Sequence, residues 1–187
     1  MNRVVILFAV TVVWLTYEGS LARADEDAAR GTAPAVLEND SVRWELGADG
    51  RTVHFTDKRS GRDYFDPARQ EMIPWTKKEG KTYPVTGAAH ESDRLTLAFG
   101  ESGIKAVLLT KIEKRHFVLE VVSVMGTPDE LCFLDIPLTL KGCLDEPFAC
   151  CALALNLKTN VPEIPGPNAR LRAMCHSRFG MEGAKVA

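Results

Sequence analysis

Apolar and polar residues alternate with a period of two from residue 36 onward. In Val42–Leu46 the apolar side chains fall on one face of an extended chain and the polar side chains on the other. Successive side chains of a strand point to opposite faces, so this pattern is typical of a half-buried strand. The Asp49-Gly50 pair that follows is a hairpin signal, because glycine adopts the positive φ that a tight turn requires. We therefore predict an opening hairpin that returns through Phe55.

The same alternation recurs along the rest of the chain. Further strands are predicted at Arg94–Phe99, Ile104–Ile112, His116–Val124, Leu131–Leu140 and Phe148–Leu157. Some of these runs are apolar on both faces, which is typical of strands that are covered on two sides. About eight to ten strands, with turn signals every 8–12 residues, indicate a sandwich or barrel. No segment keeps a helical period over three turns, although Asp66–Trp75 could form one helical turn or a crossover loop. We predict an all-β fold, an antiparallel β-sandwich.

The first 24 residues differ from the rest of the chain. Arg3 precedes the apolar run Val4–Leu15, and a polar stretch then leads to the small-x-small pattern Ala22-Arg23-Ala24. The apolar run is too short for a membrane span, which needs about 20 residues. We interpret residues 1–24 as a secretory signal peptide that is cleaved after Ala24, and we expect the mature protein in the periplasm or outside the cell.

Composition divides the remaining chain into three parts. Residues 25–35 are charged and rich in small side chains, which favours a tether. The sandwich domain is expected at 36–174, and 175–187 resembles the start of a further strand or of a truncated following domain. Between Asn156 and Asn168, three closely spaced prolines predict a stiff, extended loop at a boundary or beside a site.

Charge excludes two classes of partner. The formal net charge is −2 at pH 7, and residues of both signs are interspersed. The chain has neither the basic stripe that nucleic-acid binding requires nor a polybasic membrane patch. We expect no nucleic-acid partner and no membrane span after cleavage.

The cysteines do not follow a metal-binding pattern. An odd number, five, leaves at least one thiol outside any internal disulfide. The set most suggestive of zinc is Cys143, Cys150, Cys151, Cys175 and His176. It lacks the paired C-x-x-C spacing of structural zinc sites. We expect buried thiols, one pair of which could form a bridge, and no metal or other cofactor.

The acidic residues and the motif content do not define a catalytic centre. Glycoside hydrolysis needs two facing carboxylates, and spacing alone does not pair the many acidic residues. Glu120 and Asp135 interrupt strongly apolar strands, where a carboxylate needs a partner or a shifted pKa. We interpret both as members of structural ion pairs and assign no catalytic residue. The chain also has no P-loop, no dinucleotide-binding glycine motif and no nucleophile elbow.

Two aromatic residues are candidates for carbohydrate binding. Trp75 and Tyr83 flank the charged turn Lys77–Lys81, and neither fits an alternating core pattern. An exposed aromatic ring stacks on the apolar face of a sugar, and the lysines could donate to hydroxyls or to a uronate carboxylate. The alternative is that both rings cap the edge of the sandwich.

The opening hairpin carries a family resemblance. Leu37–Trp44, Asp49-Gly50 and Asp57–Tyr64 together resemble the entry to galactose-mutarotase-like β-sandwich domains, which precede the catalytic barrel of many secreted glycoside hydrolases. The resemblance covers about 30 residues. It implies a supersandwich-like fold and a non-catalytic N-terminal part of a secreted carbohydrate-active enzyme. The catalytic acids of such enzymes lie in the barrel, so no catalytic residue transfers to this chain.

The resemblance also sets the partners and the rival functions. It implies carbohydrate or polysaccharide as the ligand, with a following catalytic domain if the chain continues. One alternative is an exported, non-enzymatic carbohydrate-binding or envelope-interaction protein. A second is a mutarotase-like sugar epimerase, a class that uses a histidine as acid and a glutamate as base.

Overall fold

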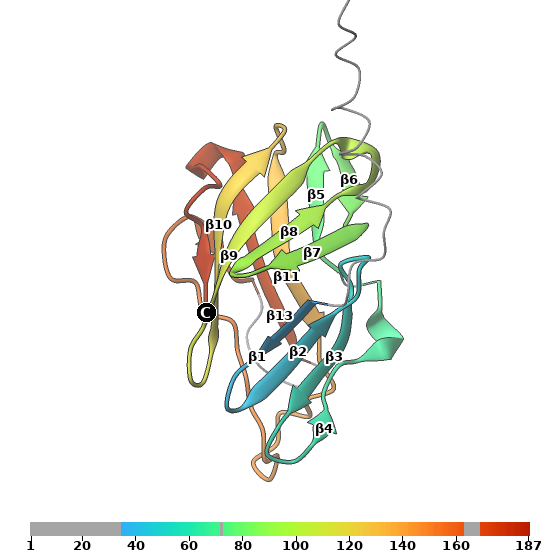
Figure 1. Cartoon of the computed structure of the whole chain (residues 1–187), viewed down its shortest axis with the longest axis vertical. Coiled ribbons are helices and arrows are strands. Elements are labelled where there is room, and N and C mark those ends of the chain that lie inside the picture. The colour runs from blue at the N-terminus through green and yellow to red at the C-terminus, as the bar shows by residue number, and fades with distance from the viewer. Residues whose placement is uncertain (1–34, 72, 163–168) are drawn as a thin grey trace, which may run out of the picture. The chain divides into compact units, whose positions relative to one another are not determined.

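The computed structural model describes residues 35–71, 73–162 and 169–187, and these residues form an all-β fold (Figure 1). Residues 1–24, interpreted as a signal peptide, lie outside the described residues, as does most of the expected tether. Within the described part, no helix has the length and apolar character to cross a membrane.

The strands form three antiparallel sheets. The first sheet has the order β1 (Ala35–Glu38), β2 (Val42–Leu46), β3 (Thr52–Asp57) and β4 (Arg62–Asp63). The second has the order β14 (Lys185–Val186), β10 (Phe117–Met125), β9 (Lys105–Ile112), β8 (Arg94–Ala98) and β7 (Gly87–Glu91). The third has the order β12 (Thr159–Asn160), β13 (Arg170–His176), β11 (Glu130–Pro137), β5 (Trp75–Lys78) and β6 (Lys81–Pro84). Short 3-10 helices are η2 (Pro67–Arg69), η3 (Gly100–Ser102) and η4 (Ser177–Phe179).

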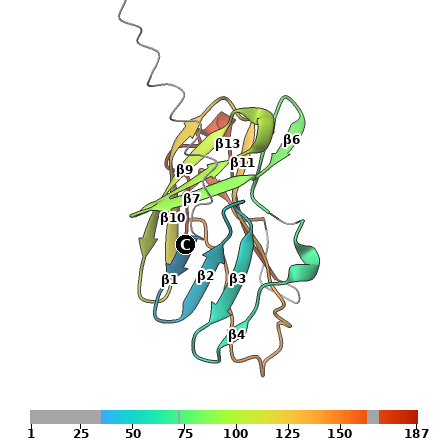
Figure 2. The same ribbon diagram turned by 45° about the vertical axis from the view of Figure 1, so that its right-hand side comes forward.

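The sheets pack in a sandwich-like arrangement around one shared core. Figure 1 shows β11 and β13 of the third sheet behind the first and second sheets, and Figure 2 shows this arrangement from a second direction. Buried side chains from all three sheets belong to a single apolar cluster. The all-β prediction is therefore confirmed, because alternation supplies each sheet with one apolar face to bury.

The opening hairpin forms as the sequence predicts. Trp44 in β2 lies opposite Phe55 in β3, and both side chains are buried. The indole Nε1 of Trp44 donates to the Thr52 hydroxyl over 3.1 Å, so the buried N–H is satisfied. Gly50 has a φ of 80°, and a Cβ at this position would overlap the Val85 side chain. Glycine is thus required at this turn both for its backbone angle and for its lack of a side chain.

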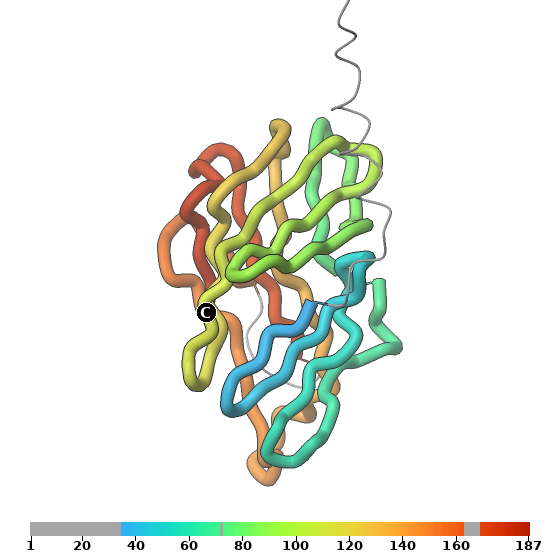
Figure 3. The backbone as a smooth tube through the Cα atoms, in the orientation of Figure 1, coloured from blue at the N-terminus to red at the C-terminus, as the bar shows by residue number. Residues whose placement is uncertain are grey.

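One expected strand is absent and one expected turn is present. The strand expected at 148–157 does not form, and Figure 3 shows the segment, in orange, as an irregular tube. Its only β-bridge joins Ala154 to Val186, and β14 is two residues long, so the segment lacks a strand along which to pair. The interpretation of 148–157 as a strand was therefore wrong. In contrast, the helical turn expected within Asp66–Trp75 is present as η2.

The C-terminal residues contribute to the same sheets. The domain boundary expected between 174 and 175 falls inside β13, whose Cys175 is fully buried in the shared core. Lys185 and Val186 form β14, which pairs with Leu119 and Glu120 of β10. Of the Pro-rich loop expected from 156 to 168, residues 163–168 lie outside the described residues, and Thr159–Asn160 in its described part form β12.

The turn that joins β3 to β4 is organised by the Asp57 carboxylate. Its Oδ2 accepts from the Ser60 hydroxyl over 2.6 Å and from the Ser60 backbone, and its Oδ1 accepts from the Arg59 backbone. Burial alone raises the pKa of Asp57, but these hydrogen bonds outweigh burial and hold the pKa below its ordinary value. The ionised carboxylate therefore stabilises the folded hairpin.

Replacing Asp57 with alanine is expected to lower the free energy of unfolding by about 1–3 kcal/mol at pH 7, because the backbone donors of the turn lose their acceptor. The folded pKa lies below the unfolded pKa, so the stabilisation is complete above roughly pH 5 and is lost as the pH falls through the folded pKa. Urea unfolding of the wild type and the Asp57→Ala variant at pH 7 and pH 3 measures this difference in the free energy of unfolding. The difference should narrow at pH 3, and Asp40→Ala, at an exposed site in the β1–β2 turn of the same sheet, should change little. A difference that widens on acidification would contradict the role assigned to the carboxylate.

Candidate functional site

The third sheet has one face in the core and one face directed away from it. Along β13 the odd-numbered side chains are buried in the shared core, and the even-numbered ones are half-buried on the opposite face. The same face continues onto β11 and β5, because Met174 lies opposite Cys132 and Cys132 lies opposite Trp75. We call this surface the outer face. Its residues are Trp75, Lys77, Glu130, Cys132, Asp135, Arg170, Arg172, Met174 and His176.

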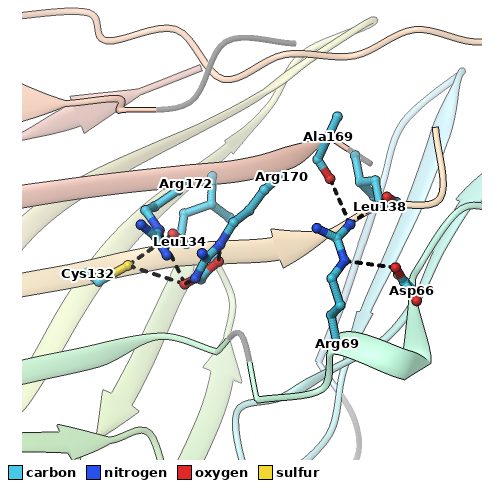
Figure 4. A network of polar contacts seen from close by, with 9 residues as sticks. Asp66, Arg69, Cys132, Leu134, Leu138, Ala169, Arg170 and Arg172 are labelled. Carbon is cyan, nitrogen blue, oxygen red and sulfur yellow. Dashed lines mark hydrogen bonds and ion pairs between the residues drawn. The ribbon is translucent and has the colours of Figure 1, made fainter. Parts of the chain in front are cut away.

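A buried ion cluster occupies the centre of the outer face (Figure 4). Arg170 donates from Nε and Nη2 to the two carboxylate oxygens of Asp135, and Arg172 Nε lies 3.5 Å from Oδ2. The Asp135 side chain is 0% exposed, while those of Arg170 and Arg172 are 14% and 20% exposed. The thiol of Cys132 donates to the Leu134 carbonyl over 3.3 Å and lies 3.9 Å from Asp135 Oδ2.

The electrostatics of this cluster are those of a structural ion pair. Burial raises the pKa of Asp135, and the guanidiniums of Arg170 and Arg172 oppose that shift. A bidentate arginine orients both carboxylate oxygens and is itself held in one plane. The interpretation of Asp135 as a paired structural residue is confirmed. Glu120 is likewise paired, because its Oε2 lies 2.6 Å from Lys185 Nζ.

A third arginine, Arg69, joins the ends of β11 and β13. Arg69 Nη2 donates to the carbonyls of Leu138 and Ala169, over 2.7 and 3.3 Å, and its Nε donates to Asp66 over 2.8 Å (Figure 4). Asp66 also caps η2 through the Ala68 N–H. Sequence reasoning missed Arg69; the Asp66-Pro67 pair is a helix-start signal, but it does not indicate where the arginine points.

The two expected sugar-binding rings do not share a face. Trp75 lies in β5 and Tyr83 in β6, so their expected position outside the strands was wrong. Tyr83 lies opposite the fully buried Thr76 and packs against the core, whereas Trp75 lies opposite Pro84 and is half-buried on the outer face. The charged turn between them is present, with positive φ at Glu79 and at the following glycine. A single platform of both rings is incompatible with this register, and Trp75 is the ring that can meet a ligand on the outer face.

A separate cavity of about 640 Å³ opens between the three sheets, and we call it the apolar cavity. Its wall includes buried core side chains such as Trp44, Phe55 and Leu171. Phe148, from the irregular segment, also lines it and stacks at 4.8 Å between ring centroids on Tyr64. The mouth carries polar residues, among them Arg115. No motif pointed to this cavity, because its residues come from distant parts of the chain.

A smaller cavity of about 390 Å³ lies beside the first sheet and contains a histidine–aspartate pair. His54 Nδ1 lies 2.6 Å from Asp63 Oδ2, and both side chains are exposed. Burial raises the pKa of Asp63, but the hydrogen bonds from His54 and from the Phe55 and Phe65 backbones outweigh it and lower the pKa. The carboxylate thereby ties β3 to β4.

The five cysteines are all free thiols, so the bridge that we allowed for is absent. Cys132 and Cys175 are buried, and burial raises the pKa of Cys175 to about 12. Cys143 and Cys151 are exposed, and Cys150 is half-buried. Among the residues that the structure describes, no group of three histidine, cysteine or acidic side chains is arranged to hold a metal ion.

Replacing Asp135 with asparagine is expected to lower the free energy of unfolding by about 3–5 kcal/mol, because two arginines lose their buried counter-charge. Glu120→Gln is the matched control, since its pair with Lys185 is partly exposed and should contribute at most about 1 kcal/mol. Urea unfolding at pH 7 measures both. In a double-mutant cycle, Asp135→Asn and Arg170→Gln should couple strongly. Effects that add to within about 0.5 kcal/mol would show that the two groups do not act as a unit.

Comparison with known proteins provides no relative. No protein-family model, no curated protein and no solved structure matches the chain. A role for the chain therefore has to be inferred from the outer face and the apolar cavity.

Proposed function

We propose that the chain is an exported carbohydrate-binding β-sandwich, the non-catalytic N-terminal part of a secreted carbohydrate-active enzyme. The observation that carries the proposal is the position of Trp75, a half-buried indole on the outer face in the row of Cys132 and Met174. The next row along β11 and β13 holds Asp135 and Arg172. An aromatic ring on the same face as planar guanidinium donors is a surface suited to a sugar ring and its substituents.

Pre-organisation is what makes this surface suitable for binding. Asp135 fixes the plane of Arg170 before any ligand arrives, so little side-chain entropy is lost on binding. The cations Lys77, Arg170 and Arg172 outnumber the acidic side chains of Glu130 and Asp135 on this face. This excess favours a sugar that carries carboxylates, such as a uronate.

The remaining parts of the proposal rest on the sequence and the architecture. The apolar run and small-x-small pattern of residues 1–24 support export. The sandwich-like packing and the opening hairpin are compatible with a supersandwich-like domain of the galactose-mutarotase type. A following catalytic domain would then supply the acids for hydrolysis, and the present domain would hold the polysaccharide near them.

Trp75→Ala is expected to weaken retention on immobilised polygalacturonate at least about 30-fold, since truncating a binding anchor costs upward of about 2 kcal/mol. The melting temperature should change little, because Trp75 does not belong to the shared core. Trp75→Phe should recover part of the retention by restoring a ring. Ile112→Ala, at an exposed position in the second sheet, is the matched control and should retain full binding. Unchanged retention of Trp75→Ala, together with an intact fold, would rule out the outer face as the binding surface and would favour an envelope-interaction protein.

One observation favours the epimerase alternative as a second candidate. Glu130 and His176 lie directly opposite each other on the outer face, so a carboxylate and an imidazole are cross-strand neighbours there. These are the two residue types that a mutarotase uses. However, Glu130 Oε1 also lies 3.8 Å from Lys77 Nζ, which favours an ion pair over a proton-transfer role.

For a binding domain, the rate of mutarotation of α-D-galactose should equal the buffer rate when polarimetry is performed with the purified chain. The Glu130→Gln and His176→Gln variants should give the same rate. Acceleration by the wild type that either variant abolishes would replace the binding proposal with the epimerase one.

A further inference from the structure

The apolar cavity has the size of a small-molecule site. Its volume of about 640 Å³ falls inside the range of ligand pockets, about 300–1,000 Å³. Core side chains line this open space, among them Leu134 and Leu171 at 7% and 8% exposure. Elsewhere in a sandwich, such side chains would pack against the facing sheet. The irregular segment carrying Phe148 covers only part of it. An apolar ligand would bury this wall and gain about 25 cal/mol for each Å² removed from water.

A buried donor without a partner lies in the lining of the cavity. Asn39 is 9% exposed, and its Oδ1 accepts from the backbone N–H groups of Ser41 and Val42 over 2.9 and 2.8 Å. Its Nδ2 has no hydrogen-bond partner among the described residues. Native proteins rarely leave a buried donor unsatisfied, because each one costs about 1–3 kcal/mol. The amide nitrogen is itself shielded from solvent, so Asn39 makes this part of the lining polar without presenting a donor to the open space.

The charges at the mouth specify the sign of the ligand's charge. Arg59, Arg115 and His116 line the cavity and are exposed. The acidic side chain of the lining is Asp57, whose carboxylate is already engaged by Ser60 and by the Arg59 backbone. The side chains of the lining therefore include two guanidiniums and one carboxylate, and this excess of positive charge complements an anion.

We propose that the apolar cavity binds a single-chain amphiphilic carboxylate. Its hydrocarbon tail packs against the wall formed by Trp44, Phe55 and Leu171. Its carboxylate faces the mouth, where Arg59 and Arg115 supply positive charge. This site is independent of the outer face, because none of the outer-face residues lines the cavity.

Two cysteines in the lining allow the site to be located directly. Cys150 and Cys151 line the cavity, whereas Cys143 is exposed and lies outside it. The purified chain is treated with N-ethylmaleimide with and without 11-(dansylamino)undecanoic acid, and the alkylation rate of each cysteine is read by peptide mapping. We expect a saturating concentration of the dansyl acid to slow alkylation of Cys151 at least about fivefold, because the bound acid shields the thiol from the reagent. The rate at Cys143 should not change.

The head group is tested by titrating dansyl fluorescence with the acid and with its methyl ester. The wild type should bind the acid at least about tenfold more tightly than the ester, which corresponds to about 1.4 kcal/mol. Arg59→Glu/Arg115→Glu should remove that preference. Ala149→Trp, at an exposed position in the lining, should block both ligands, and Ala154→Trp, at an exposed position outside it, should block neither.

Three outcomes would overturn the proposal. Equal affinity for acid and ester would show that the mouth does not select an anion. Binding that leaves the Cys151 rate unchanged would place the amphiphile elsewhere. Absence of saturable binding of the acid up to about 100 µM, in a chain whose melting curve shows that it is folded, would show that the cavity does not take an amphiphilic carboxylate. Trp75→Ala should bind the acid normally, so a failure here is distinguishable from a failure of the carbohydrate proposal.

Discussion

The bidentate pair between Arg170 and Asp135 constrains the centre of the third sheet from its outer side. Strand β11 is buried on both faces, because one face joins the shared core and the other carries a carboxylate that is fully shielded from water. A charge in such a place is tolerable only with a counter-charge in good geometry. The pair therefore couples the register of β11 to that of β13, and Trp75 takes its position on the outer face through its pairing with the same strand.

Local patterns predicted the parts of the fold that local physics determines. The opening hairpin follows from alternation and from a glycine turn, both of which are written within Val42–Leu46 and Asp49-Gly50. The pairing of Asp135 was also predictable, since a carboxylate in an apolar strand requires a partner. Its partners were not, because Arg170 lies 35 residues away and only the β11–β13 register brings it close. Alternation along β13 would have indicated that Arg170 and Arg172 share a face, but not which face.

Candidate site residues were harder to predict than strands because a site depends on which faces meet. Trp75 and Tyr83 look equivalent in the sequence, as aromatic residues on either side of a charged turn. A two-residue turn at Glu79 and Gly80 fixes the pairing of the strands, and this register sends the two rings to opposite faces. The apolar cavity was not predictable at all, since it is an opening between three sheets. It exists because segments that are distant in the sequence do not pack closely enough to fill the space between the sheets.

The irregular segment from 141 to 158 explains why that opening persists. Residues 148–155 are apolar, as in a buried strand, yet a two-residue β14 offers too short an edge for them to pair along, and Leu157 is fully exposed. Had the segment formed a full strand beside β14, the second sheet would extend further across the cavity and its side chains would fill the space. Instead Phe148, Cys150 and Ala152 pack against the core, and the Phe148 ring stacks on Tyr64. The same shortage of pairing partners that defeats the strand prediction therefore leaves an apolar wall open beside cationic side chains, which is the combination that an amphiphilic anion requires.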